Sequence, residues 1–174
     1  MLSGLAALLA LPRTSRAQQA SAPAFRFDSI DGGVIDLADW RGGPVLVVNT
    51  ASLCGFAPQF DELQALSDRF GPRGLRVLAV PSNDFRQELA DAAAVKSYCA
   101  MTFDLTLPMT DITPVRGPGA HPFYRWMAEE HGFAPGWNFN KVLLDGAGQP
   151  VATWGAPVKP LSPRVIRQIE SVLK

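Results

Sequence analysis

The sequence has few of the residues that build metal centres, disulfide scaffolds or nucleic-acid surfaces. Its 174 residues include two cysteines and two histidines, too few for a disulfide-stapled fold. They stand at Cys54, Cys99, His121 and His131, and no two have the close spacing of a zinc-ligand pair. His121 is expected instead to pack or to cap the helix that follows it. The 16 Lys and Arg balance the 16 Asp and Glu, and no glycine-rich phosphate loop is present. We therefore predict no metal, no cofactor, no nucleic-acid partner and no anionic membrane partner.

The first part of the chain differs from the rest. Residues Leu2 to Leu11 are almost wholly apolar, a run too short to cross a bilayer but suited to the apolar core of a signal peptide. Ser15-Arg16-Ala17 offers small residues for cleavage before Gln18, although no basic segment precedes the run. Two interpretations stay open: residues 1–23 are a shortened export signal, or they are a disordered tail. The first predicts a periplasmic or exported protein without membrane insertion, and the second a cytoplasmic one.

The remaining residues, 24–174, are predicted to form one domain, since 47% of the chain is hydrophobic. Hydrophobic periodicity separates strands from helices along it. The predicted strands are Phe25–Phe27, Val34–Asp36, Pro44–Thr50, Leu75–Val80, Phe139–Leu144 and Val151–Trp154, and the predicted helices are Gln59–Phe70, Ala90–Met101, Ala120–His131 and Pro163–Leu173. This order resembles the thioredoxin-like plan, an α/β fold with a central mixed sheet, helices on both faces and an N-terminal β-hairpin.

Cys54 is the residue that indicates chemistry most directly. It follows the buried strand and stands between Leu53 and Gly55, where the next helix is predicted to begin. The unpaired N–H groups and the dipole at a helix start favour thiolate over thiol. Because the turn is tight, we expect the Cys54 side chain to be exposed; the alternative is a small buried hydrophobe, the usual role of a free cysteine. Position 57 is alanine, so no Cys-x-x-Cys redox motif is present.

Cys99 lies 45 positions after Cys54, on a predicted helix. Three interpretations compete: a core thiol, a permanent disulfide partner of Cys54, or a resolving thiol that condenses with a sulfenic acid on Cys54. If the two sulfurs begin far apart, the helix must loosen first, because a disulfide tolerates only a short Cα separation. The spacing does not decide among the three.

Neutral hydrogen-bond donors form the other candidate group. Trp137 and Asn138 carry N–H donors that could stabilise a thiolate without a counter-cation, although a core aromatic and a turn residue are the simpler interpretation. Asn83 and Asp84 follow the second buried strand, at the same sheet edge as Cys54. Active sites collect at the carboxyl ends of parallel strands, but Asn83 could equally cap a helix.

Together these segments resemble the glutathione peroxidase family, in its cysteine rather than selenocysteine form. The likeness runs from about Phe25 to Lys174, and its specificity lies in the combination and order of the motifs. The segments are Asn49–Gln59 for the peroxidatic motif, Leu78–Phe85 for the second motif, Tyr98–Met109 for the resolving cysteine of many non-vertebrate members, and then Ala120–Tyr124 and Trp137–Lys141.

The resemblance implies a catalytic tetrad of Cys, Gln, Trp and Asn. Cys54, Trp137 and Asn138 carry over, whereas Asp84 stands at the Gln position. The Gly-Gln-Glu stretch after that position is altered to Arg86-Gln87-Glu88. An ionised Asp84 near Cys54 would disfavour the thiolate. Asp84 is therefore either protonated, turned away, or replaced in its role by Gln87.

The resemblance also implies a function, a thiol peroxidase in the response to oxidative stress. Cys54 would reduce hydrogen peroxide and organic hydroperoxides, Cys99 would resolve the oxidised cysteine, and a thioredoxin-like protein or glutathione would recycle the enzyme. The short link from Met109 to His121 resembles monomeric members. The alternatives are a thiol–disulfide oxidoreductase, which the missing Cys-x-x-Cys disfavours, a redox sensor that passes oxidation to a partner, and a binding domain with a permanent Cys54–Cys99 bridge.

Overall fold

The computed structural model describes residues 21–173, so the prediction made for residues 1–23 lies almost wholly outside the described part of the chain. Ala22 already belongs to the folded unit. Its N–H donates to the carbonyl oxygen of Ala147 at 3.1 Å, and its own carbonyl accepts from Arg41 Nη2 at 2.7 Å. Tertiary contacts therefore begin slightly before the boundary predicted at residue 24.

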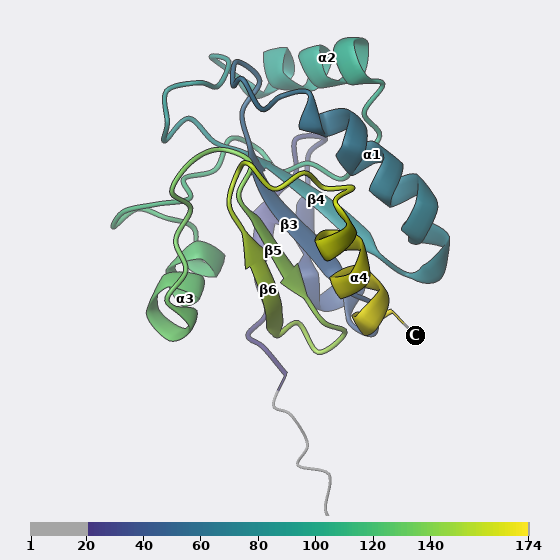
Figure 1. Cartoon of the computed structure of the whole chain (residues 1–174). Coiled ribbons are helices and arrows are strands. Elements are labelled where there is room, and N and C mark those ends of the chain that lie inside the picture. Colours follow the sequence, from purple (N-terminus) through teal and green to yellow (C-terminus); the bar gives the residue numbers. More distant parts are fainter. Residues whose placement is uncertain (1–20, 174) are drawn as a thin grey trace, which may run out of the picture.

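A four-stranded mixed sheet forms the centre of the molecule (Figure 1). Its strand order is β4-β3-β5-β6, with β3 and β4 parallel and the other two pairings antiparallel. Every residue of β3 is buried, as expected of a central strand covered on both faces. A separate hairpin pairs β1 with β2. The strands are β1 (Arg26–Asp28), β2 (Val34–Asp36), β3 (Val45–Thr50), β4 (Arg76–Pro81), β5 (Lys141–Leu144) and β6 (Pro150–Trp154).

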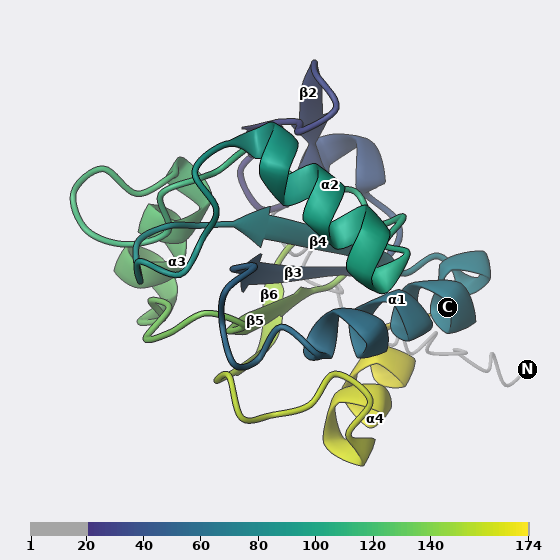
Figure 2. The same cartoon turned by 90° about the horizontal axis from the view of Figure 1, so that it is seen from above.

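Helices cover both faces of the sheet, which confirms the predicted thioredoxin-like fold (Figure 2). α1, α2 and α4 contribute to one core cluster, and α3 contributes to the other together with β1. None of the helices among residues 21–173 is long and apolar enough to cross a membrane. The helices are α1 (Gln59–Phe70), α2 (Ala92–Phe103), α3 (Pro122–His131) and α4 (Pro163–Val172), with short 3-10 turns η1 (Leu37–Trp40) and η2 (Gly71–Arg73).

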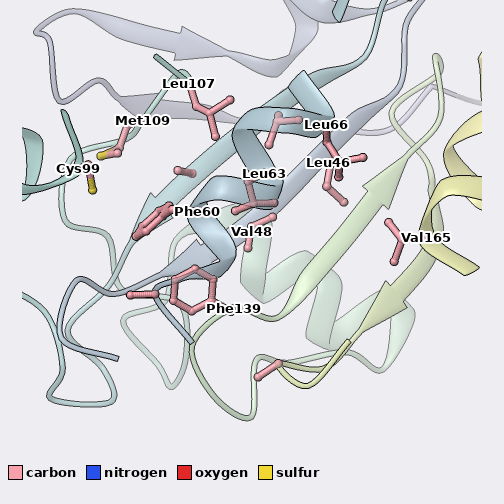
Figure 3. Close-up of a cluster of buried hydrophobic side chains, with 14 of the residues drawn as sticks. Leu46, Val48, Phe60, Leu63, Leu66, Cys99, Leu107, Met109, Phe139 and Val165 are labelled. Atoms are coloured by element: carbon pink, nitrogen blue, oxygen red, sulfur yellow. The ribbon is translucent and has the colours of Figure 1, made fainter. Parts of the chain in front are cut away.

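The alternation of side chains along β3 explains why there are two cores. Leu46 and Val48 belong to the cluster under α1, whereas Val45 and Val47 belong to the cluster under α3. Figure 3 shows the first cluster, in which α1 side chains lie over β3 and Cys99 lies at one end. The second candidate sulfur is therefore a packed part of this core.

Three predicted element starts shift by two residues. α2 begins at Ala92 because Asp91 caps it, with Oδ1 accepting from Ala94 N at 2.9 Å. α3 begins at Pro122, and His121 caps it through Nδ1, as predicted for that histidine. β5 begins at Lys141 because Phe139 has a left-handed φ of 61°, which no strand residue adopts.

Candidate active site

Cys54 lies in the turn between β3 and α1. The helix begins at Gln59, as its periodicity predicts, so Cys54 precedes the helix and does not lie at its start as expected. A backbone N–H of the turn contacts the sulfur instead: Phe56 N donates to Cys54 Sγ at 3.5 Å. The turn is closed by Ala57 N, which donates to the Cys54 carbonyl at 2.8 Å. The backbone of the turn, rather than the end of a helix, presents a donor to the sulfur.

The Cys54 side chain is buried, which corrects the expectation that it is exposed. The residue is only 5% exposed and belongs to the same apolar cluster as Ala51, Ala57 and Phe60. The turn thus folds its small residues onto the start of α1. Leu53, the residue before Cys54, is 60% exposed. A tight turn therefore buries the sulfur and leaves its larger neighbour at the surface.

Gln87 connects the Cys54 turn with Asn138. Its carbonyl oxygen accepts from Leu53 N at 2.9 Å, and its side-chain Oε1 accepts from Asn138 Nδ2 at 3.0 Å. Asn138 is fully buried, and its Oδ1 has no hydrogen-bond partner. Gln87 and Asn138 thus form a neutral amide pair beside the cysteine turn. Their mutual bond uses Gln87 Oε1 and Asn138 Nδ2, which leaves Gln87 Nε2 and Asn138 Oδ1 outside it.

Trp137 is held in place through its backbone. Its carbonyl oxygen accepts from Asn49 Nδ2 and from Asn140 Nδ2, both at 2.9 Å. Its ring lies 5.2 Å from the ring of Phe85, centroid to centroid, and the residue is 42% exposed. Asn49 belongs to β3, so the segment that carries Trp137 and Asn138 is anchored to the strand that leads to Cys54.

Asp84 has a different set of contacts. Its Oδ2 accepts from the backbone N–H groups of Val115 and Arg116 at 2.6 and 3.0 Å. The carboxylate therefore holds the 115–116 loop, which corresponds to the turned-away alternative among the three. The neighbouring Asn83 does not cap a helix; its Oδ1 accepts from Glu88 N at 3.3 Å and shapes the loop that presents Gln87.

Cys99 is the second thiol of the site region. Both cysteines are free, so the structure contains no bridge between them. Cys99 is 2% exposed, and burial, followed by the nearby Glu88 charge, raises the pKa of its thiol to about 12. The Ser52 side chain acts in the opposite direction and lowers that pKa. Cys99 is therefore a neutral thiol at physiological pH in this reduced conformation.

Ser52 and Glu88 are site residues that the sequence did not single out. Glu88 Oε1 accepts from Ser52 N at 3.0 Å and from Leu89 N at 2.8 Å. Burial is the main cause that raises the pKa of Glu88. The altered stretch 86–88 was visible in the sequence, but nothing in it indicated that the glutamate would lie buried beside Cys99.

Both histidines contact other parts of the molecule, and the His131 ring packs edge-on against Trp126 of α3. His121 Nε2 lies 2.8 Å from the Arg26 carbonyl, and its ring stacks on Phe27 at 3.8 Å. Burial is the main cause that lowers the pKa of His121. Within residues 21–173, no group of three or more His, Cys, Asp or Glu side chains is placed to hold a metal ion.

Comparison with known proteins agrees with the resemblance found in the motifs. The family model described as glutathione peroxidase matches residues 24–128. The hydroperoxy fatty acid reductase gpx1 of Synechocystis sp. is 38% identical over 150 residues, which cover 78% of this chain and 87% of that protein. The thioredoxin/glutathione peroxidase BtuE of Escherichia coli strain K12 is 32% identical over 169 residues, which cover 83% and 92% of the two chains. The crystal structure of T. cruzi GPX1 shares 27% identity with a TM-score of 0.64, covering 85% of this chain and 93% of that one. By these matches the chain belongs to the glutathione peroxidase family.

Proposed function

We propose that the protein is a thiol peroxidase that reduces hydrogen peroxide and organic hydroperoxides at Cys54. The observation that carries the proposal is the geometry of the turn: Phe56 N–H points at Sγ, and Gln87 ties the same turn to Asn138. The thiolate attacks the outer peroxide oxygen and the O–O bond breaks. Cys54 becomes a sulfenic acid, and the departing oxygen takes a proton to leave as water or alcohol.

Asn138, Trp137 and Gln87 then act on the reacting oxygens. Asn138 is buried and fixed on Gln87, and Trp137 stands at the boundary with solvent. Their N–H groups are neutral donors, which stabilise developing negative charge without a cation that would trap the thiolate. Gln87 takes the donor role of the family's tetrad Gln, whose position Asp84 occupies here. The contact of Gln87 with Asn138 uses Oε1 and leaves the Gln87 amide nitrogen as a donor. Asp84 instead supports the 115–116 loop.

Cys99 resolves the oxidised enzyme in this proposal. Its sulfur attacks the Cys54 sulfenic acid, a disulfide forms, and water leaves. A dithiol reductant such as a thioredoxin-like protein, or glutathione, then restores both thiols. The likeness to the thioredoxin/glutathione peroxidase BtuE supports these two reductant classes.

The surface around the Cys54 turn suits hydroperoxides with an apolar body. Leu53 and Trp137 are 60% and 42% exposed, and both belong to the segments that form the site. Apolar surface of this kind favours contact with acyl chains rather than with charged substrates. The similarity to the Synechocystis hydroperoxy fatty acid reductase supports the same substrate class.

We further propose that residues 1–23 direct export, that residues 24–174 form the working unit, and that this unit is a monomer. The short Met109–His121 link supports the monomer, and the apolar run from Leu2 supports export. Light scattering of the purified protein tests whether it is a monomer. N-terminal sequencing of protein from the periplasmic fraction tests export, and a cytoplasmic, uncleaved product contradicts it.

Stopped-flow peroxide consumption tests the main proposal. Cys54→Ser should abolish turnover, whereas Cys99→Ser should complete one fast peroxide reduction and then stop when thioredoxin is the donor. Undiminished turnover in Cys54→Ser ends the proposal. An enzyme that reduces insulin disulfides but ignores peroxide would be a thiol–disulfide oxidoreductase instead.

A further inference from the structure

A buried polar cluster lies next to the Cys54 turn and joins three segments of the chain. Ser52 comes from the turn, Glu88 from the loop after β4, and Cys99 from α2, and their exposures are 2%, 8% and 2%. Within the described part of the chain, no ion pair includes Glu88. A buried carboxyl group without a counter-charge is costly and calls for a function.

The two oxygens of Glu88 have different surroundings. Oε1 accepts two backbone N–H bonds, from Ser52 and Leu89, and so fixes the carboxyl group against the turn. Oε2 is buried and has no hydrogen-bond partner, and the same holds for the Ser52 hydroxyl. The Ser52 side chain lies close enough to Glu88 and to Cys99 to lower the pKa of each, although its hydroxyl is not hydrogen-bonded to either of them. An unpartnered carboxyl oxygen, a rotatable hydroxyl and a thiol are thus buried near one another.

We propose that Glu88 accepts the proton of Cys99, through the Ser52 hydroxyl, when Cys99 resolves oxidised Cys54. The inference rests on the proposed peroxidase function. In the step, the Cys99 sulfur forms the S–S bond as the S–O bond of the sulfenic acid breaks. The proton of Cys99 reaches Glu88, and a proton from this carboxyl group then joins the departing hydroxide to give water. The sulfenic acid is the oxidant and Cys99 the reductant, so no other redox partner is needed.

The resolving thiol needs such an acceptor. With its pKa raised to about 12 and 2% exposure, Cys99 holds little thiolate at neutral pH. The raised pKa of Glu88 brings its proton affinity nearer to that of a thiol. Lys96 and Asp31 line a cavity of about 150 Å³ together with Cys99, and they pair with each other. Glu88 is therefore the base that faces the thiol.

Single-turnover kinetics of Glu88→Gln test the proposal, because the amide keeps an oxygen acceptor for both N–H groups but takes up no proton. After one equivalent of hydrogen peroxide, dimedone trapping measures Cys54 oxidation and non-reducing mass spectrometry measures the disulfide. We expect Cys54 oxidation within about twofold of wild type. Disulfide formation should slow about 100-fold at pH 7, the typical contribution of a general base. Its rate should then rise about tenfold per pH unit up to pH 9, more steeply than in wild type.

Two further variants separate a proton-transfer role from a structural one. Glu62→Gln is the matched control: Glu62 Oε2 accepts a backbone N–H, from Leu161 at 2.9 Å, and it should leave disulfide formation unchanged. Ser52→Ala keeps the carboxylate and should slow the disulfide about tenfold. Wild-type disulfide rates and pH profile in Glu88→Gln overturn the proposal. If Glu88→Gln does not fold, unchanged resolution in Ser52→Ala overturns it instead. Absence of Cys54 oxidation in the wild type would end the proposed peroxidase function itself.

Discussion

Cys54 and Cys99 belong to the same buried cluster but have opposite electrostatic surroundings. Cys54 lies in a turn, receives a backbone N–H on its sulfur, and adjoins a neutral amide pair. Cys99 lies inside a helix beside a carboxyl group, and its thiol is held neutral. Both residues are at most 5% exposed, so burial alone does not separate them. Under the proposed mechanism, hydrogen-bond donors and nearby charge therefore decide which sulfur reacts with peroxide and which one resolves the oxidised cysteine.

The largest effect should appear in the alkylation of Cys99. In Cys54→Ser, iodoacetamide should label native Cys99 about 1000-fold more slowly than the same thiol in urea, because its pKa rises from 9.0 to about 12. A raised thiol pKa means that thiolate appears only as pH increases. Labelling should therefore accelerate about tenfold per pH unit between pH 7 and 9, as followed by mass spectrometry. Equal labelling rates of Cys99 in the native protein and in urea at pH 7 would show that the fold does not suppress its thiolate, and the contrast with Cys54 would be lost.

Asn138→Ala should give the next largest effect. Loss of one preorganised N–H donor typically slows such a step about 100-fold. Stopped-flow measurement of the second-order rate of Cys54 with hydrogen peroxide checks this. The alkylation rate of Cys99 serves as the internal control and should not change. A variant that oxidises at the wild-type rate would show that Asn138 only fills space next to Gln87.

Gln87 and Asp84 can be separated by their different effects. Gln87→Ala should slow Cys54 oxidation about 100-fold, as Asn138→Ala does, because both a donor and the support of Asn138 are lost. Asp84→Ala should change that rate less than about twofold. It should instead lower the free energy of unfolding by about 1–3 kcal/mol, since the N–H groups of Val115 and Arg116 lose their acceptor. Urea unfolding measures the second quantity, and the reverse assignment of the two effects would return Asp84 to the active site.

The fold was readable from the sequence wherever local pattern decides structure. The apolar run of β3 and the helical period of α1 are local signals, and both elements appear within a residue of their predicted bounds. The loop that replaces the predicted strand start at Phe139 is not local in origin. Its left-handed backbone accompanies a bond from Phe139 N to the Asn49 carbonyl in β3, far away in the sequence.

The site was readable only in part for the same reason. The positions of Cys54, Trp137 and Asn138 follow from motifs, but the burial of Cys54 depends on how its turn folds onto α1. Contacts between Gln87 and Asn138, and between Ser52 and Glu88, span 51 and 36 positions. Spacing along one chain carries no signal for such pairs, so the polar surroundings of the two thiols appear only in the folded structure.

The smallest predicted effect concerns the apolar rim beside Cys54. Leu53→Ala should raise the KM for a fatty-acid hydroperoxide about three- to fivefold, because part of the surface that would contact an acyl chain is lost. The rate with hydrogen peroxide should not change, since that substrate has no apolar body. Val34→Ala, another exposed aliphatic residue but on β2, is the matched control and should leave both values unchanged. Equal loss with both peroxides would mean that Leu53 shapes the turn around the sulfur, and Cys54 would then depend on its neighbour for position rather than for substrate contact.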